Sequence, residues 1–397
     1  MSKVTKSVLL TISVITMITA CGRNGKADDP IGESGKTVRT ENMLAILKAQ
    51  ADSGVYMFGH HDDVVYGIGW ESDYDNDSTI GTKSDVKSVC NDFPAVLSFD
   101  LGHIELGDDK NLDGVPFKRI RQEIINHFDH GGMITLSWHL DNPLSGGTSW
   151  VADSLKDIEK NTVASVIEGG KQHELFLTWL DKVADFLNSL ETPYGVKVPV
   201  LFRPWHEHTG SWFWWGQDFC TPEQYKSLWT LTVDRLKDRG VVNALYAYSP
   251  GTEPDGDATK YLERYPGDDI IDVVGLDCYC FAPDADTVKI AKFADDLDKN
   301  LAMVSKVAKA HNKVMALTET GYEGIKTSDW WTNTLAPVLE KYPIGYVLVW
   351  RNARERPQHH FAPYPGHAST TNFVEFYNLK ETLFLHDVSG LYLSNNN

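Results

Sequence analysis

Residues 201–216 carry the side chains best suited to chemistry on a bound ligand: Leu-Phe-Arg-Pro-Trp-His-Glu-His-Thr-Gly-Ser-Trp-Phe-Trp-Trp-Gly. An apolar, strand-like run ends here in an arginine, two histidines, one carboxylate and four tryptophans. Packing alone seldom requires such a group at the end of a strand. A carboxylic acid among donors and flat aromatic faces suits acid–base work on a stacked ligand, and sugars stack on indole rings. We therefore expect a sugar site around Glu207.

Glu319 is a second glutamate that directly follows an apolar run, and it forms a candidate catalytic pair with Glu207. Retaining glycosidases hold two carboxyl groups about 5–5.5 Å apart, one as nucleophile and one as acid and then base. The acid needs a raised pKa, which the tryptophans around Glu207 favour, whereas the nucleophile must stay ionised. Candidate donors to the nucleophile are Arg203, His206 and Tyr279. We therefore assign the acid/base role to Glu207 and the nucleophile role to Glu319. The alternative is that either glutamate is only a structural ion-pair partner of an arginine.

Short apolar, β-branched runs alternate with amphipathic stretches along the whole chain. The predicted strands are 55–59, 95–100, 133–139, 198–203, 244–249, 273–279, 314–319 and 345–350. The predicted helices include 123–128, 173–190, one opening at Thr221, 286–311, 328–342 and 371–384. Near-continuous apolar strands are typical of buried parallel sheets, so we predict an α/β fold, a (β/α)8 TIM barrel, as a single catalytic domain over residues 37–390. The alternative, an open doubly wound sheet, lacks its glycine-rich phosphate loop after the first strand.

Polar side chains follow nearly every predicted strand at its carboxyl end. These residues are His60, His61, Asp62, Asp100, His103, Trp138, His139, Arg203 to His208, Asp277 to Tyr279, Thr318 to Thr320, Trp350 and Arg351. In a barrel the carboxyl ends of the strands meet at one face, which is where such folds carry their active sites. The fold therefore explains how residues far apart in the sequence share one site.

A metallohydrolase is the alternative suggested by five histidines near strand ends. These are His60, His61, His139, His206 and His208. Barrel metallohydrolases usually place a His-x-His pair on the first strand, whereas adjacent histidines on a strand point to opposite faces. Glu207 already has a clear role between two of these histidines. We therefore predict no metal site and no cofactor.

The N-terminal residues are predicted to direct export. An apolar run over 8–20 is too short to span a bilayer, follows two lysines and ends in small residues before Cys21. This pattern resembles a bacterial lipoprotein signal, with residues 1–20 removed, Cys21 lipidated and 21–36 acting as a flexible tether. An ordinary secretory peptide is the alternative. We expect an exported lipoprotein at the outer membrane, facing the periplasm or the cell surface and anchored only by lipid.

The net charge indicates which partners to expect, and the cysteine spacings indicate whether disulfides form. A net charge of −18 argues against nucleic acid and anionic lipid, and it is compatible with a neutral polysaccharide. The four cysteines beyond Cys21 have spacings that fit no disulfide framework or zinc pattern, so free thiols are favoured over a bridge. We expect a monomer.

The segment 203–216, together with Leu317-Thr-Glu-Thr-Gly321, resembles glycoside hydrolase family 26, in which β-1,4-mannanases dominate. The resemblance covers essentially the whole chain after the tether, and its motifs are long. It implies a (β/α)8 barrel with catalytic carboxylates on the fourth and seventh strands. Glu207 would be the acid/base and Glu319 the nucleophile, in agreement with the assignment from their surroundings.

The same resemblance implies roles for further side chains. His206 would orient the acid, and Tyr279 would hydrogen-bond the nucleophile. Arg203 would hold the charges around the nucleophile, and Arg351 would reach the next sugar on the non-reducing side. The subsite of the cleaved bond would be lined by His139, Trp150, Trp212 and Trp350.

The implied activity is hydrolysis of β-1,4-mannosidic linkages in mannan, galactomannan or glucomannan by double displacement, which releases manno-oligosaccharides such as mannobiose. The alternatives are a β-glucanase or β-1,3-xylanase on the same scaffold, and a glycan-binding lipoprotein without catalysis. Trp214 and Trp215 form either a sugar platform or loop packing. The long connection over 141–171 either walls off one end of the cleft or grips a long chain.

Overall fold

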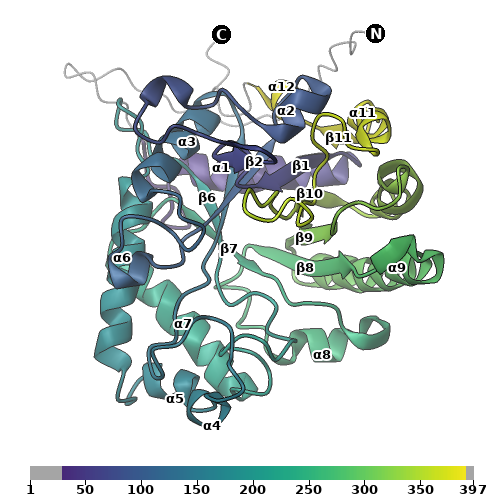
Figure 1. The fold of residues 1–397 in the computed structure, drawn as a ribbon. Helices are drawn as coiled ribbons and strands as arrows, with labels where there is room; N and C mark the ends of the chain where they lie inside the picture. Colours follow the sequence, from purple (N-terminus) through teal and green to yellow (C-terminus); the bar gives the residue numbers. More distant parts are fainter. Residues whose placement is uncertain (1–28, 390–397) are drawn as a thin grey trace.

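A closed barrel of eight parallel strands forms the centre of the computed structural model, which describes residues 29–389 (Figure 1). The strands pair in chain order, and the first also pairs with the last, which closes the sheet. The barrel strands are β1 (Tyr56–His61), β4 (Val96–Asp100), β5 (Met133–Ser137), β6 (Val200–Arg203), β7 (Ala244–Tyr248), β8 (Val273–Cys280), β9 (Val314–Tyr322) and β10 (Ile344–Val349). The predicted (β/α)8 barrel is confirmed, and the pairing of β1 with β10 excludes the open sheet.

Helices follow each barrel strand and cover the outside of the sheet (Figure 1). They are α2 (Asp85–Cys90), α3 (Phe117–Asp129), α6 (His173–Ser189), α7 (Pro222–Asp238), α8 (Ala258–Glu263), α9 (Thr287–Ala310), α10 (Ala336–Leu339) and α11 (Thr370–Tyr377). The start of α7 is fixed by a capping box, in which Thr221 and Gln224 each accept the other's backbone N–H, and by proline at the first helical position. This local signal explains why the sequence predicted where α7 begins.

The longest helix that was not predicted from the sequence is α1 (Val38–Asp52), which contacts β7, β9 and β10. Its buried Met43 and Leu47 pack with apolar residues near the starts of the barrel strands, among them Met57 and Val314. The apolar residues 43–47 of α1 are consecutive, so they show no helical spacing in the sequence. Helix α1 therefore closes the end of the barrel opposite the carboxyl ends of its strands.

The helix predicted over 371–384 is too long at its C-terminal end. In the structure α11 stops at Tyr377, and the chain turns into a short strand, β11 (Thr382–Leu383), which pairs with the start of β1. Leu383 and Phe384 are buried, with 5% and 0% of their surface exposed. Burial against the barrel therefore decides the conformation of these apolar residues, where helical spacing predicted otherwise.

Part of the predicted tether contacts the domain. Ile31 forms a bridge with Thr37, and the Lys36 ammonium lies 2.7 Å from the Asp272 carboxylate. The predicted signal peptide, the lipidation site Cys21 and the rest of the tether lie outside the described residues. Within the described part of the chain, no helix has both the length and the apolar character needed to cross a membrane.

The four cysteines of the described domain are free thiols, as the spacings predicted. They are Cys90, Cys220, Cys278 and Cys280, and all but Cys90 are buried. Cys278 and Cys280 lie on β8 on either side of Tyr279, which faces the candidate site. The side-chain alternation of β8 thus buries both thiols behind the barrel wall.

Candidate active site

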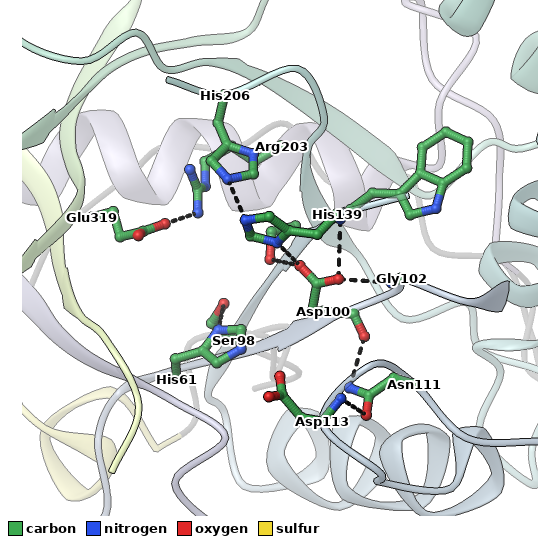
Figure 2. Close-up of polar contacts among 12 residues, drawn as sticks. His61, Ser98, Asp100, Gly102, Asn111, Asp113, His139, Arg203, His206 and Glu319 are labelled. Carbon is green, nitrogen blue, oxygen red and sulfur yellow. Dashed lines mark hydrogen bonds and ion pairs between the residues drawn. The ribbon is translucent and has the colours of Figure 1, made fainter. Parts of the chain in front are cut away.

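Charged and polar side chains from five strands meet at the carboxyl end of the barrel (Figure 2). His61 and Asp100 end β1 and β4, Arg203 ends β6, Glu319 lies in β9, and His139 follows β5 by two residues. Most of these side chains have few solvent contacts, so their charges must be balanced by one another. The predicted convergence of strand ends is therefore present.

The Glu319 carboxylate is held by a donor on each of its two oxygens. The Arg203 guanidinium forms an ion pair with Oε2, and the Tyr279 hydroxyl donates to Oε1 at 2.5 Å. Burial alone would lower the pKa of Arg203, but the neighbouring carboxylates Asp277 and Glu319 raise it. The guanidinium therefore stays charged, and Glu319 is presented as an oriented carboxylate. Both predicted contacts, Arg203 and Tyr279, are present, whereas the third candidate donor, His206, points elsewhere.

Asp277 completes this ion cluster and was not selected from the sequence as a site residue. Its carboxylate lies 2.8 Å from Arg203, and it accepts hydrogen bonds from Ser249 and Thr318 at 2.9 and 2.7 Å. Burial raises the pKa of Asp277 to about 7, although Arg203 opposes that effect. The pairing of β8 with β9 shifts by one residue immediately before Asp277, which then pairs with Glu319. Such a bulge depends on tertiary pairing, so no sequence pattern reveals it.

Glu207 has different surroundings from Glu319. It lies in the turn after β6, is partly exposed, and accepts one hydrogen bond, from the Trp212 indole N–H at 2.9 Å. Burial and then the negative charges of Glu319 and Asp277 raise the pKa of Glu207 well above its usual range, while Arg203 opposes them. A raised pKa favours the protonated form of the carboxyl group, which is the form that a general acid requires.

A chain of hydrogen bonds runs from Asp100 through His139 to His206 (Figure 2). The Asp100 carboxylate lies 2.6 Å from His139 Nδ1, and the two Nε2 atoms of His139 and His206 are 3.0 Å apart. Burial alone would lower the pKa of His139, but Asp100 raises it above the usual value. Burial and the charge of Arg203 lower the pKa of His206 well below its usual range.

These contacts correct the role predicted for His206. No hydrogen bond joins His206 to Glu207 in the described structure; its Nε2 faces His139 and its Nδ1 has no hydrogen-bond partner there. The donor that orients the acid is Trp212. Asp100, which fixes the ring of His139, was visible at a strand end but was not selected, because its partner lies on another strand.

Trp350 and Arg351 follow β10 and form one side of the site. The indole of Trp350 stacks on His61, with ring centroids 4.1 Å apart and an angle of 22°. The Arg351 guanidinium lies 3.2 Å from Asp113 and 2.9 Å from Glu355. Both side chains are thus fixed before any ligand binds, and His61 supports Trp350.

One group of metal-ligating side chains occurs within residues 29–389. Ligand atoms of His61, Asp62 and Asp113 all lie within 4.8 Å of one another. Both carboxylates of this group already have partners, since Arg351 pairs with Asp113, and the hydroxyl of Tyr66 donates to Asp62 at 2.5 Å. It also contains neither candidate catalytic glutamate, so its arrangement suits the support of Arg351 better than catalysis.

The tryptophans of the 201–216 segment divide into two groups. Trp205, Trp214 and Trp215 have 0% of their surface exposed, so the open choice for Trp214 and Trp215 is decided in favour of loop packing. Trp212 is 39% exposed, and Trp150, on the long connection after β5, is 59% exposed. That connection pairs its backbone with the β6 loop through Trp150 and Phe213. The exposed rings are therefore the ones available to a ligand.

Comparisons with known proteins agree with this site. The model of glycosyl hydrolase family 26 matches residues 33–332. The structure of a GH26 beta-mannanase from Bacteroides ovatus is 52% identical, with a TM-score of 0.83, and the match covers 90% of this chain and 98% of that one. The catalytic domain of a GH26 endo-beta-1,4-mannanase from Bacillus sp. JAMB-750 is 32% identical, with a TM-score of 0.80, over 93% and 97% of the two chains.

A curated relative is much longer than this chain. The mannan endo-1,4-beta-mannosidase of Bifidobacterium adolescentis is 31% identical over 86% of this chain, but the match spans only 34% of that protein's length. The chain thus corresponds to about a third of that relative and to nearly all of the solved Bacteroides ovatus structure. The match of the family model over most of the barrel, together with these structural neighbours, shows that the chain belongs to glycosyl hydrolase family 26.

Proposed function

We propose that this protein is a retaining glycoside hydrolase that cleaves β-1,4-mannosidic linkages in mannan, galactomannan or glucomannan and releases manno-oligosaccharides. The observation that carries the proposal is the unequal setting of two carboxyl groups. Glu319 has a donor on each oxygen, whereas Glu207 has a raised pKa and a single indole donor. One group is kept ready to attack and the other is kept ready to give a proton.

In the first step, a Glu319 oxygen bonds to the anomeric carbon while the bond from that carbon to the leaving oxygen breaks. Glu207 transfers its proton to the leaving oxygen, so the departing sugar leaves as a neutral alcohol. Tyr279 and Arg203 hold Glu319 in the attacking orientation throughout. Trp350, Trp212, Trp150 and His139 would line the sugar at the cleaved bond, and Arg351 would contact the next sugar on the non-reducing side.

In the second step, the Glu207 carboxylate takes a proton from water. The water oxygen bonds to the anomeric carbon, and the bond to Glu319 breaks, so the product has the β configuration of the substrate. Glu207 must be protonated for the first step, and its pKa is raised. Activity should therefore persist above the ordinary pKa range of a glutamate and fall as the pH rises through the raised value.

The names of the relatives favour mannan over the β-glucan and β-1,3-xylan alternatives, because the curated relative and the two solved neighbours named above are described as mannanases. The paired settings of Glu207 and Glu319 argue against a binding protein without catalysis. Such a protein would have no reason to hold a charged guanidinium and a tyrosine hydroxyl on one buried carboxylate.

The test is to follow hydrolysis of mannohexaose by proton NMR and to compare mannan, barley β-glucan and β-1,3-xylan in a reducing-sugar assay. We expect the β-anomer of the new reducing end to appear first, and hydrolysis of mannan at a far higher rate than of the other two. Initial release of the α-anomer would contradict the retaining mechanism, and preference for another polymer would contradict the substrate. A barrel that binds mannan without releasing reducing ends would show the non-catalytic alternative.

We also propose that the protein is exported as a lipoprotein, anchored through Cys21 to the outer membrane and facing the periplasm or the cell surface, and that it acts as a monomer. The N-terminal sequence supports the export and lipidation parts of this proposal. Expression of Cys21→Ser should move the protein from the membrane fraction to the soluble exported fraction, and wild-type protein alone should incorporate labelled palmitate. Equal membrane association of both proteins would contradict lipid anchoring.

A further inference from the structure

The turn that carries Glu207 has an unusual backbone. Trp205 and Glu207 have φ values of 58° and 53°, in the left-handed region that disfavours residues with a side chain. Neither residue is glycine, asparagine or aspartate, so the turn does not adopt this shape by preference. Contacts from elsewhere in the fold must hold it.

Those contacts reach three consecutive carbonyl groups. The Tyr225 hydroxyl donates to the carbonyl oxygen of Trp205 at 2.6 Å, the Trp215 indole donates to that of His206 at 2.8 Å, and the backbone N–H of Gly210 donates to that of Glu207 at 2.9 Å. In addition, the N–H of Glu207 donates to the Ser249 carbonyl at 2.8 Å. The peptide groups from Trp205 to Glu207 are therefore each held by at least one hydrogen bond.

Helix α7 is the rigid element behind this turn. Tyr225 lies in its first turn, directly after the capping box, and has 0% of its surface exposed. A second residue of α7, Thr232, lies with its hydroxyl 3.2 Å from the Trp205 indole N–H. Helix α7 thus holds both the backbone and the side chain of Trp205, two residues before Glu207.

We propose that Tyr225 is a positioning residue for the acid/base Glu207, acting through its hydrogen bond to the Trp205 carbonyl. Loss of the hydroxyl leaves a buried carbonyl unpaired beside two left-handed residues, so the turn has a reason to relax. A relaxed turn moves the Glu207 carboxyl away from the leaving oxygen and lowers proton transfer. The inference rests on the proposed glycosidase function.

The experiment compares two substrates that differ in their need for an acid. Mannotetraose has a sugar leaving group, which must be protonated, whereas 2,4-dinitrophenyl β-mannobioside has a leaving group that departs without a proton. For Tyr225→Phe we expect kcat/KM to fall about tenfold on mannotetraose and to stay near the wild-type value on the dinitrophenyl substrate. The second step still needs Glu207 as a base, so kcat on the dinitrophenyl substrate should fall. Azide, which needs no base to attack the intermediate, should restore it.

Tyr261→Phe is the matched control. Tyr261 is also fully buried and its hydroxyl donates to a backbone carbonyl, that of Gly275 at 2.8 Å, but among the described residues it has no hydrogen bond to the Glu207 turn. This variant should leave the ratio of the two kcat/KM values unchanged. If Tyr225→Phe does not fold, Thr232→Val tests the other contact of α7 with Trp205. It should change the ratio of the two kcat/KM values in the same direction.

Each result has one meaning. An equal loss on both substrates, or no loss in a folded variant of Tyr225 or Thr232, overturns the positioning role. Failure of the wild-type protein to hydrolyse either β-mannoside overturns the proposed function instead, because there is then no proton transfer that Tyr225 could assist.

Discussion

Glu319 and Glu207 occupy two regions of the same barrel mouth that differ in almost every physical respect. Glu319 lies on a strand, is 5% exposed, and is fixed through a cluster in which Arg203 is shared with Asp277. Glu207 lies in a left-handed turn, keeps some contact with solvent, and has one indole donor. The surroundings of Glu319 hold a charged carboxylate in a fixed position, whereas the surroundings of Glu207 raise the pKa of a carboxyl group in a loop.

The difference fits the two chemical roles that we propose for the same type of side chain. A nucleophile gains from donors that favour its charged form, and an acid gains from partial burial and neighbouring negative charges that favour its neutral form. The strand provides fixed donors because its neighbours are fixed by sheet pairing. The loop provides a more open position, which a leaving group and then a water molecule must both reach.

Replacement of Glu319 should have the largest effect, because it removes the attacking atom itself. Glu319→Gln should lower kcat on mannan by about 10⁴-fold or more, measured by reducing-sugar release. Azide should not restore activity, since the first step is lost. The control is Glu323→Gln, a change at an exposed carboxylate shortly after Glu319 that pairs with His359, and it should retain near wild-type activity. Comparable activity in the two variants would contradict the nucleophile assignment.

Replacement of Glu207 should reveal the contrast between the two regions most clearly. Glu207→Gln should lower kcat/KM on mannan by about 10²- to 10⁴-fold, because only proton transfer is lost. It should still form the glycosyl–enzyme bond with 2,4-dinitrophenyl β-mannobioside, seen as a burst of dinitrophenol. Azide should then release β-mannobiosyl azide. A variant without a burst, or a product of α configuration, would contradict the acid/base role.

Arg203→Lys should disrupt the ion pairs around Glu319 while keeping a positive charge at position 203. A single ammonium cannot make the two separate contacts that the guanidinium makes with Asp277 and Glu319, so we expect kcat to fall about 10²-fold. The melting temperature should also fall, since buried carboxylates are left poorly paired. Arg235→Lys is the matched control, because Arg235 makes a two-pronged contact with Asp181 on the outer helices. An equal loss of kcat in both variants would contradict the role of Arg203 in holding Glu319.

Trp212→Phe should have the smallest effect and tests the region around Glu207. The indole N–H favours the charged form of Glu207, so its loss should raise the pKa of that group further. The alkaline limb of the kcat/KM profile should therefore move up by roughly 0.5 to 1 pH unit. Trp214→Phe, at a buried position in the same loop, should leave that limb in place. A limb that moves down in Trp212→Phe would show that another group sets it.

The barrel and the position of its candidate catalytic pair could be predicted because both depend on local patterns. Buried parallel strands appear as apolar runs, and the polar residues that follow them are easily seen, which located Glu207, Glu319 and Arg203. The capping residues before α7 likewise act within one turn of helix. The sequence left Trp214 and Trp215 open between a sugar platform and loop packing, because an irregular loop has no period from which burial can be read.

The remaining site residues depend on contacts between distant segments. Asp277 reaches Glu319 only because the β8–β9 pairing shifts by one residue, and Asp100 has its partner on the next strand. Tyr225 has the appearance of an ordinary buried helix residue until its hydroxyl is seen on the Trp205 carbonyl. Helix α1 was missed for a similar reason, since the interior of the barrel sets its burial.

The division of labour between Glu319 and Glu207 is tested most directly by trapping the covalent intermediate. The protein would be treated with 2,4-dinitrophenyl 2-deoxy-2-fluoro-β-mannobioside, digested with trypsin and analysed by tandem mass spectrometry. We predict one fluoromannobiosyl group per protein, on the peptide 314–326, with fragment ions that place it on Glu319. A label on Glu207, or hydrolysis of β-mannosides without any covalent adduct, would contradict the account.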